Sequence, residues 1–295
     1  MRSATSTNHM PARGPAEQLL RADTSALASA LHISLPEARR EVQMLLTHAG
    51  QVDLASLLAH PERAAQAHST PVYTQTLARR LSGEPMAYVL GEREFYALAF
   101  ETSPAVLIPR PETELLVEMA LQRLPAHSAA AALDLGTGSG CIAVVLAKLR
   151  PAARIVATDL SPEALAVAQS NARRHGVTNI AFRAGSWFEA VAGERFDLIV
   201  SNPPYVARGD AHLLQGDLRF EPAVALTAGP SGLEALQAIV SEAPRYLAAG
   251  GSLLVEHGYG QSEAVALLLR SAGLVDVIAR NDLAGIVRAA AARRP

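Results

Sequence analysis

Cysteine is nearly absent from the 295-residue chain, which contains Cys141 alone. A single cysteine excludes an intramolecular disulfide and favours a reducing, cytoplasmic location. No uninterrupted apolar run reaches roughly 20 residues, so we expect no membrane span. The nine histidines show no paired spacing with cysteine or acidic residues, so we expect no metal site.

Basic residues are not in surplus. The formal net charge is -2, whereas nucleic-acid-binding domains usually carry an excess of lysine and arginine, so we expect no direct contact with nucleic acid. With 49% hydrophobic and 18% charged residues, the composition is typical of a folded globular protein. The length allows one large domain and a smaller one, and we expect a monomer.

The first 111 residues divide into three predicted parts. Residues 1–15 are polar and lack the apolar centre of a signal peptide, so we interpret them as a disordered leader. Residues 16–81 have apolar side chains at helical spacing, with short polar turns between, which predicts a small helical domain. Residues 82–111 include β-like stretches at 88–90 and 95–96, and we interpret them as a β-hairpin connector.

Residues 112–295 alternate between predicted strands and helices, which indicates an α/β fold with a mostly parallel sheet covered on both faces. One helix is expected over residues 161–175, where Ser161 can cap and Pro162 suits the first turn. The predicted strands are residues 131–135, 154–159, 179–184, 196–201 and 252–257, with two more in the tail at 274–279 and 285–290.

The first of these strands runs into a glycine turn, Gly136-Thr137-Gly138-Ser139-Gly140. Glycines allow positive φ angles and a close approach of ligand to backbone. Asp159 ends the next strand, where an acidic residue typically binds ribose hydroxyls. The pattern predicts an adenosine-type cofactor at the carboxyl edge of the sheet, with Trp187 beside its ring.

A second motif, Asn202-Pro203-Pro204-Tyr205, follows the strand at 196–201. The Asn202 side-chain oxygen and the Pro203 carbonyl can accept hydrogen bonds from a planar NH2 group. Proline contributes no competing N–H donor and has a fixed φ, while the Tyr205 ring can stack on a flat amide. The motif alone fits adenine N6, cytosine N4 or a glutamine side chain equally well.

Taken together, the motifs resemble the release factor glutamine methyltransferases, the PrmC/HemK family of class I S-adenosylmethionine-dependent enzymes. The resemblance covers nearly the whole chain beyond the leader. It rests on residues 83–85, 91–96, 107–114, 134–140, 187–188, 201–205, 215–222, 256–258 and 282–285. The stretch Ile-Pro-Arg-Pro-Glu-Thr-Glu at 108–114 is the most specific of these.

The resemblance implies N5-methylation of the glutamine in the Gly-Gly-Gln loop of peptide chain release factors, with S-adenosylmethionine as methyl donor. It implies a Rossmann-like sheet whose final strand is antiparallel, and a helical N-terminal domain that helps to bind the protein substrate. It gives cofactor roles to Gly136–Gly140, Asp159, Trp187 and Asn202. The acceptor roles fall on Asn202, Pro203, Pro204 and Tyr205, with Asn202, Pro203 and Tyr205 as the catalytic set.

One position departs from the family pattern. Many relatives have aspartate before the tryptophan, where it can accept from the adenine amino group, but this chain has Ser186. A hydroxyl can accept without a charge, so we expect either a lower affinity for the cofactor or an adenine contact made elsewhere. The alternatives are glutamine methylation of a ribosomal protein, an adenine N6 or cytosine N4 methyltransferase, and a non-catalytic cofactor-binding adaptor.

Overall fold

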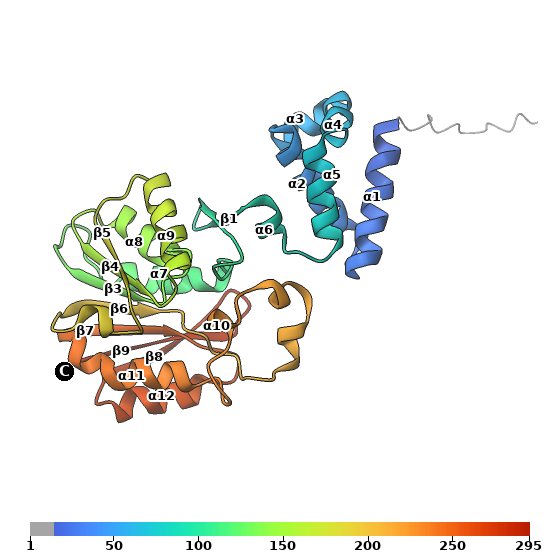
Figure 1. Cartoon of the computed structure of the whole chain (residues 1–295). Coiled ribbons are helices and arrows are strands. Elements are labelled where there is room, and N and C mark those ends of the chain that lie inside the picture. The colour runs from blue at the N-terminus through green and yellow to red at the C-terminus, as the bar shows by residue number, and fades with distance from the viewer. Residues whose placement is uncertain (1–14) are drawn as a thin grey trace, which may run out of the picture. The chain divides into compact units, whose positions relative to one another are not determined.

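The computed structural model describes residues 15–295, which form two compact units divided between Leu90 and Gly91 (Figure 1). The leader expected over residues 1–15 lies, up to residue 14, outside the described residues. The boundaries predicted at 81/82 and 111/112 stay predictions.

The N-terminal unit is helical throughout its described length. Ser34 and Thr70 cap two of its helices by accepting from the backbone N–H groups of Glu37 and Tyr73, and a proline follows each cap in the first turn. The buried side chains include Leu27, Leu45, Leu46 and Tyr73. The helices are α1 (Pro15–Leu31), α2 (Leu35–Gly50), α3 (Leu54–Ala59), α4 (Pro61–His68), α5 (Pro71–Leu81) and α6 (Met86–Leu90).

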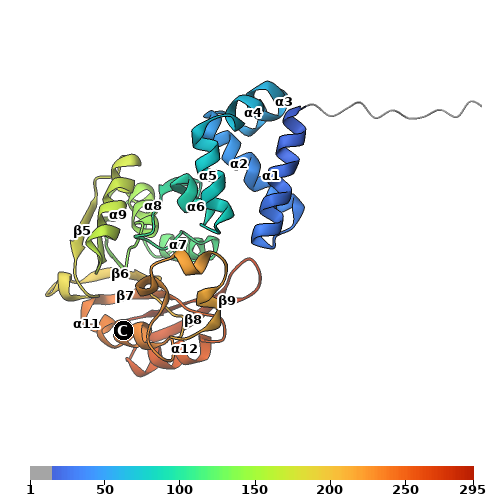
Figure 2. The same ribbon diagram turned by 45° about the vertical axis from the view of Figure 1, so that its right-hand side comes forward.

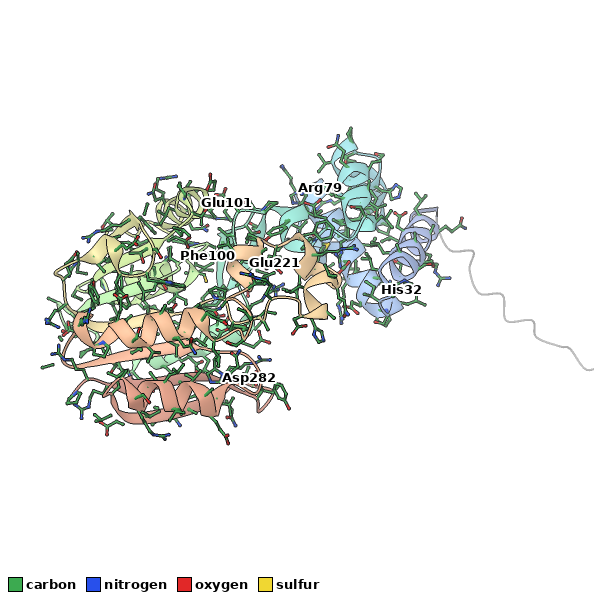
Figure 3. The ribbon with its side chains drawn as sticks, turned by 60° about the horizontal axis from the view of Figure 1, so that its bottom comes forward. His32, Arg79, Phe100, Glu101, Glu221 and Asp282 are labelled. Carbon is green, nitrogen blue, oxygen red and sulfur yellow. The ribbon has the colours of Figure 1, made fainter. Side chains whose placement is uncertain are left out.

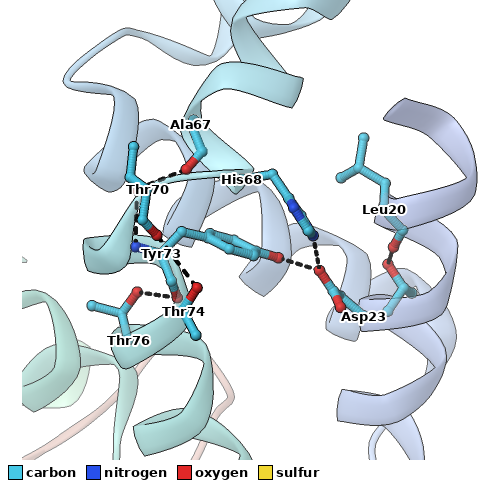
Figure 4. Close-up of polar contacts among 9 residues, drawn as sticks. Leu20, Asp23, Ala67, His68, Thr70, Tyr73, Thr74 and Thr76 are labelled. Carbon is cyan, nitrogen blue, oxygen red and sulfur yellow. Dashed lines mark hydrogen bonds and ion pairs between the residues drawn. The ribbon is translucent and has the colours of Figure 1, made fainter. Parts of the chain in front are cut away.

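A polar contact among three of these helices accompanies the apolar core (Figure 4). Asp23 on α1 accepts a 2.6 Å hydrogen bond from the Tyr73 hydroxyl on α5, and its same oxygen lies 3.0 Å from Nε2 of His68 on α4. Burial raises the pKa of Tyr73, so the phenol stays a donor. The Asp23 carboxylate therefore links α1 to α4 and α5.

The predicted hairpin is present as β1 (Glu92–Phe95) paired antiparallel with β2 (Leu98–Glu101). The β-like interpretation of residues 88–90 is wrong, because they belong to α6. The Pro85 carbonyl accepts from the N–H groups of Tyr88 and Val89, which starts a helical turn, and burial of Tyr88 and Val89 stabilises it. Tertiary packing has here overridden the β propensity of the side chains.

The C-terminal unit contains a seven-stranded sheet with the order β5-β4-β3-β6-β7-β9-β8. β9 runs antiparallel to both neighbours, and the pairs among β5, β4, β3, β6 and β7 are parallel. The strands are β3 (Ala131–Leu135), β4 (Arg154–Asp159), β5 (Ile180–Ala184), β6 (Phe196–Ser201), β7 (Leu247–Glu256), β8 (Val275–Asn281) and β9 (Val287–Arg293). This is the predicted Rossmann-like sheet with an antiparallel final strand.

Helices cover both faces of the sheet (Figures 1 and 2). One apolar cluster packs α7 (Glu114–Leu121) and α8 (Cys141–Leu149) on the sheet, with α9 (Pro162–Arg174) beside α8. The other packs α11 (Glu234–Tyr246) and α12 (Ser262–Ser271) on the opposite face. Short elements connect these layers: η1 (Pro111–Thr113), η2 (Glu189–Val191), η3 (Ala211–Leu214), η4 (Gly216–Phe220) and α10 (Ala223–Leu226).

The two tail strands lie slightly later in the chain than predicted. Gly285, expected in the last strand, is in the hairpin turn at φ 80°, and its N–H donates to the carbonyl of Asp282. The alanines at 289–292 are buried in β9, where small side chains pack against the neighbouring strands. Alanine is a poor strand former, so pairing with β7 and β8 decides this element.

Candidate active site

A cavity of about 480 Å³ opens among the loops that follow β3, β4, β5 and β6. The carboxyl ends of these parallel strands meet at one edge of the sheet, where α/β folds bind their ligands. The predicted residues that line the cavity are Gly136, Thr137, Gly138, Ser139, Asp159, Trp187, Asn202 and Pro204, and Ser186 lines it too.

The glycine turn depends on positive φ angles and on space that side chains do not fill. Gly136 and Gly138 have φ values of 69° and 54°, and a Cβ on Gly138 would meet no protein atom within 4 Å. Gly140 does not line the cavity, and a Cβ there would lie 3.0 Å from the Cβ of Ala168 on α9. Gly138 thus leaves space for a ligand at the backbone, while Gly140 allows the start of α8 to pack closely on α9.

Asp159 connects the glycine turn to the next helix. Its Oδ2 accepts from the N–H of Gly138 at 2.9 Å, and its Oδ1 accepts from the N–H of Ser161 at 2.9 Å. Each carboxylate oxygen has further acceptor capacity, which two neighbouring ribose hydroxyls can use. The turn and this carboxylate therefore fit an adenosine-type cofactor.

A second carboxyl, that of Asp134, stabilises the glycine turn through Thr137. It is buried at the end of β3, and its Oδ2 accepts a 2.7 Å hydrogen bond from the hydroxyl of Thr137. Burial raises the pKa of Asp134 to about 7. Its neighbour Cys141 is also buried, which raises the pKa of the thiol to about 12 and leaves it unreactive.

Trp187 and Ser186 form the wall of the cavity after β5. The Trp187 ring would lie 3.7 Å from a Cβ on Gly136, so the indole packs over the start of the glycine turn. Trp187 has φ 46°, in the left-handed region that bulky residues rarely adopt. The N–H of Ser186 donates to Glu189 at 3.0 Å, a contact that holds the strained turn.

Asn202 is held by a side chain from another segment. Its Nδ2 donates to the hydroxyl of Thr113 at 3.0 Å. Pro204 lines the same cavity, Pro203 is buried, and Tyr205 lines a second cavity of about 260 Å³. The motif therefore stands between the two cavities.

Comparisons with known proteins agree with this geometry. Residues 126–278 match a family described as methyltransferase domain, and residues 18–91 match the PrmC N-terminal domain. The release factor glutamine methyltransferase of Bordetella pertussis is 53% identical over 85% of this chain and 93% of its own length. That of Escherichia coli is 44% identical over 83% of this chain and 88% of its own length.

This chain belongs to the release factor glutamine methyltransferase family. Solved structures agree on the fold. The hMettl16 catalytic domain has a TM-score of 0.56 at 16% identity, covering 75% of this chain and 83% of that one. A 16S rRNA methyltransferase from T. thermophilus, in complex with AdoMet and guanosine, has a TM-score of 0.52 at 20% identity, covering 69% and 50%.

Three residues at the site were not predicted from the sequence to be functional. Thr113 is buried and contacts Asn202, and Glu256 is buried at the end of β7 and contacts Thr113. Glu221, labelled in Figure 3, accepts from the N–H of Ile108 and pairs with Arg110. Glu256 carried a usable signal, since an acid that ends a buried strand is the pattern that identified Asp159.

Arg110 and Glu221 join the 108–114 stretch to the loop around η4. The Glu221 side chain is fully buried, and its pKa is raised by burial although the Arg110 guanidinium opposes that rise. Arg110 lines both cavities. Two segments of the family resemblance, 107–114 and 215–222, are therefore held together beside the site.

Within residues 15–295, no group of three or more histidine, cysteine or acidic side chains is placed to hold a metal ion. No helix in that same part of the chain combines the length and apolarity needed to cross a bilayer.

Proposed function

We propose that the chain methylates the N5 atom of the glutamine side chain in the Gly-Gly-Gln motif of peptide chain release factors, with S-adenosylmethionine as donor. Membership of the release factor glutamine methyltransferase family supports the reaction. The observation that carries the proposal is the placement of Asn202, whose amide lies on the cavity lined by the glycine turn and is held through its nitrogen by Thr113.

The cofactor half of the site consists of the glycine turn, Asp159, Ser186 and Trp187. The open space at Gly138 suits the close approach of a nucleoside, Asp159 accepts from ribose hydroxyls, and Trp187 offers a ring face. S-adenosylmethionine, when bound, supplies an electrophilic methyl group on a sulfonium.

The acceptor half of the site consists of Asn202, Pro203, Pro204 and Tyr205. It has to make the amide nitrogen of glutamine, which is a poor nucleophile, reactive toward the methyl group. The lone pair of an amide nitrogen is delocalised into its carbonyl, and acceptors on both N–H bonds favour a geometry in which that lone pair is directed at the methyl group. The Asn202 oxygen and the Pro203 carbonyl supply these acceptors. Their hydrogen bonds strengthen as positive charge develops on the nitrogen, so they stabilise the transition state more than the bound substrate.

Tyr205 completes the acceptor half, and Pro204 before it lines the first cavity. Burial raises the pKa of Tyr205, so its hydroxyl stays protonated and donates to Glu256 at 3.1 Å. That bond orients the ring, whose face suits a planar amide or a cation. No strong base is required before transfer, because the methylated nitrogen is acidic and loses its proton afterwards.

The test is incubation of the purified chain with methyl-labelled S-adenosylmethionine and a release factor, followed by mass mapping of the modified residue. We expect one methyl group on the Gly-Gly-Gln glutamine and none on a Gln→Ala variant of that loop. Equal labelling of the variant would contradict the proposal. Greater incorporation into DNA, RNA or a ribosomal protein than into the release factor would redirect it to one of those substrates.

The proposal also covers the binding of the release factor, the oligomeric state and the location of the enzyme. The helical N-terminal unit, matched by the PrmC N-terminal domain, helps to bind the release factor, and the enzyme acts as a monomer in the cytoplasm without contacting nucleic acid. Size-exclusion chromatography with light scattering, with and without a release factor, tests the stoichiometry.

A further inference from the structure

A buried chain of hydrogen bonds runs behind the Asn202 motif. Asn202 Nδ2 donates to Thr113 Oγ1 at 3.0 Å, and Thr113 Oγ1 donates to Glu256 Oε2 at 2.8 Å. The Tyr205 hydroxyl donates to the other oxygen, Glu256 Oε1, at 3.1 Å. Thr113 and Glu256 are 2% and 1% exposed, so water has little access to compete for these bonds.

The number of protons in this series of hydrogen bonds decides which way the Asn202 amide faces. A threonine hydroxyl has one proton, and an ionised carboxylate can only accept. The Thr113 proton is therefore committed to Glu256, and the Thr113 oxygen can only accept from Asn202. The NH2 end of Asn202 must face Thr113, which leaves its oxygen free for the cavity that Asn202 lines.

We propose that Thr113 and Glu256 are positioning residues that turn the Asn202 oxygen toward the acceptor NH2 group, and that they do so only while Glu256 Oε2 carries no proton. The inference rests on the proposed function, because an oxygen facing the cavity matters only when the acceptor presents N–H donors. Thr113 lines the cavity beside Asn202, but its hydroxyl proton is committed to Glu256, so Thr113 acts through Asn202. Glu256 acts through Thr113 and Tyr205.

Protonation of Glu256 reverses the arrangement. A proton on Oε2 makes that oxygen a donor to Thr113, whose own proton then turns toward Asn202. The Asn202 oxygen moves to accept it, and the NH2 group faces the NH2 of the acceptor. The reversal requires the proton on Oε2, because a proton on Oε1 leaves Oε2 as the acceptor of the Thr113 hydroxyl and disturbs Tyr205 alone.

The surroundings of Glu256 bring this change into an accessible pH range. Burial raises the pKa of Glu256 to about 7, and the hydroxyl groups of Thr113 and Tyr205 oppose that rise. His257, the residue after β7, is held neutral because burial lowers its pKa. The charged and titratable groups around Glu256 are Arg110, Glu112, Cys141, Tyr205, Asp217, His257 and Arg288.

The first experiment removes the hydroxyl that connects Asn202 to Glu256. In single-turnover methylation of a release factor, we expect T113V to lower the rate roughly 10- to 100-fold, the range for one misdirected hydrogen bond at a reacting centre. T113S keeps the hydroxyl and should recover most of that loss. A buried threonine of the C-terminal unit that lines neither cavity, changed as T102V, is the matched control and should keep the wild-type rate.

The second experiment follows the orientation of the amide itself. The Asn202 side-chain NH2 resonances, assigned by their loss in N202A, should shift with pH in the wild-type chain with a midpoint near 7. In E256Q they should not titrate between about pH 6 and 8, and the acid limb of the methylation pH profile should disappear with them. The glutamine amide can donate or accept toward Thr113, so the E256Q plateau should be about threefold to tenfold lower.

The outcomes separate the inference from the proposed function. A wild-type chain that labels no release factor overturns the function and leaves the resonance titration to decide the amide orientation. A wild-type chain that methylates while T113V and T113S react alike overturns the inference. Persistence of the resonance shift in E256Q also overturns it.

Discussion

The glycine turn at 136–140 is held by residues that are near in sequence, among them Asp134 and Asp159, whereas Asn202 is held by side chains from distant segments. Gly138 contacts Asp159, 21 residues away, through its own N–H. Asn202 contacts Thr113 across 89 residues, and Thr113 contacts Glu256 across 143. The cofactor half of the site follows from local chain geometry, and the acceptor half depends on the completed fold.

This difference assigns separate kinetic roles to the two halves. An open glycine turn with the Asp159 carboxylate beside it binds a cofactor in much the same way before and during the reaction. Directed acceptors on a reacting NH2 group gain strength only as charge develops there. Substitutions in the cofactor half should therefore weaken binding of S-adenosylmethionine, and those in the acceptor half should slow the chemical step.

The largest effect is expected for N202A. Loss of the Asn202 oxygen removes a transition-state acceptor, so kcat for release factor methylation should fall on the order of 1000-fold. The dissociation constant for S-adenosylmethionine, measured by calorimetry, should change far less than kcat, because N202A removes one side chain of the cavity while the glycine turn and Asp159 are untouched. A parallel loss of cofactor affinity would show that the two halves are not separable.

The converse variant, D159A, should weaken binding of S-adenosylmethionine about 10- to 100-fold, because two acceptors for ribose hydroxyls are lost together with the contact to Gly138. At saturating cofactor, kcat should fall only a few-fold. D159N is the matched control, since it keeps one acceptor oxygen and should lose less affinity. A large fall in kcat at saturation would place Asp159 in the chemical step.

The same difference explains how much could be predicted from sequence. The strand, turn and acid at Leu135, Gly136–Gly140 and Asp159 form one contiguous βαβ unit, so spacing predicted their arrangement. The meeting of Thr113, Glu256 and Asn202 requires η1, β7 and the loop after β6 to converge, and no local period encodes that. Residues 88–90 were misassigned for a related reason, because a tertiary contact decided their conformation.

Glu256 also allows a stability test of the acceptor half. Its folded pKa of about 7 lies above its ordinary value of 4.5, so the folded state binds more protons between these values. The associated stability is fully present below about pH 4.5 and is lost as the pH rises toward 7. Over that window, the unfolding free energy of the wild type should fall relative to E256Q by on the order of 2 kcal/mol.

Chemical denaturation at several pH values measures this difference. Asp134, whose pKa is also raised to about 7, contributes a similar fall in both proteins, so the difference between them isolates Glu256. An identical pH dependence in wild type and E256Q would mean that Glu256 ionises freely. The orientation of the Asn202 amide would then not change as the pH falls through neutrality.

The smallest effect is expected for S186D, in the wall of the cofactor cavity. A carboxylate at this position accepts with a full charge, so affinity for S-adenosylmethionine should rise about threefold to tenfold. The exposed Glu189, which accepts from the N–H of residue 186, repels the added charge and limits the gain. Calorimetry with S186D and with S186N, an uncharged acceptor of similar size, separates charge from shape, and kcat should stay unchanged in both. Equal affinities of S186D and S186N for S-adenosylmethionine would show that charge at this position is irrelevant. Binding of the cofactor would then depend on the glycine turn and Asp159.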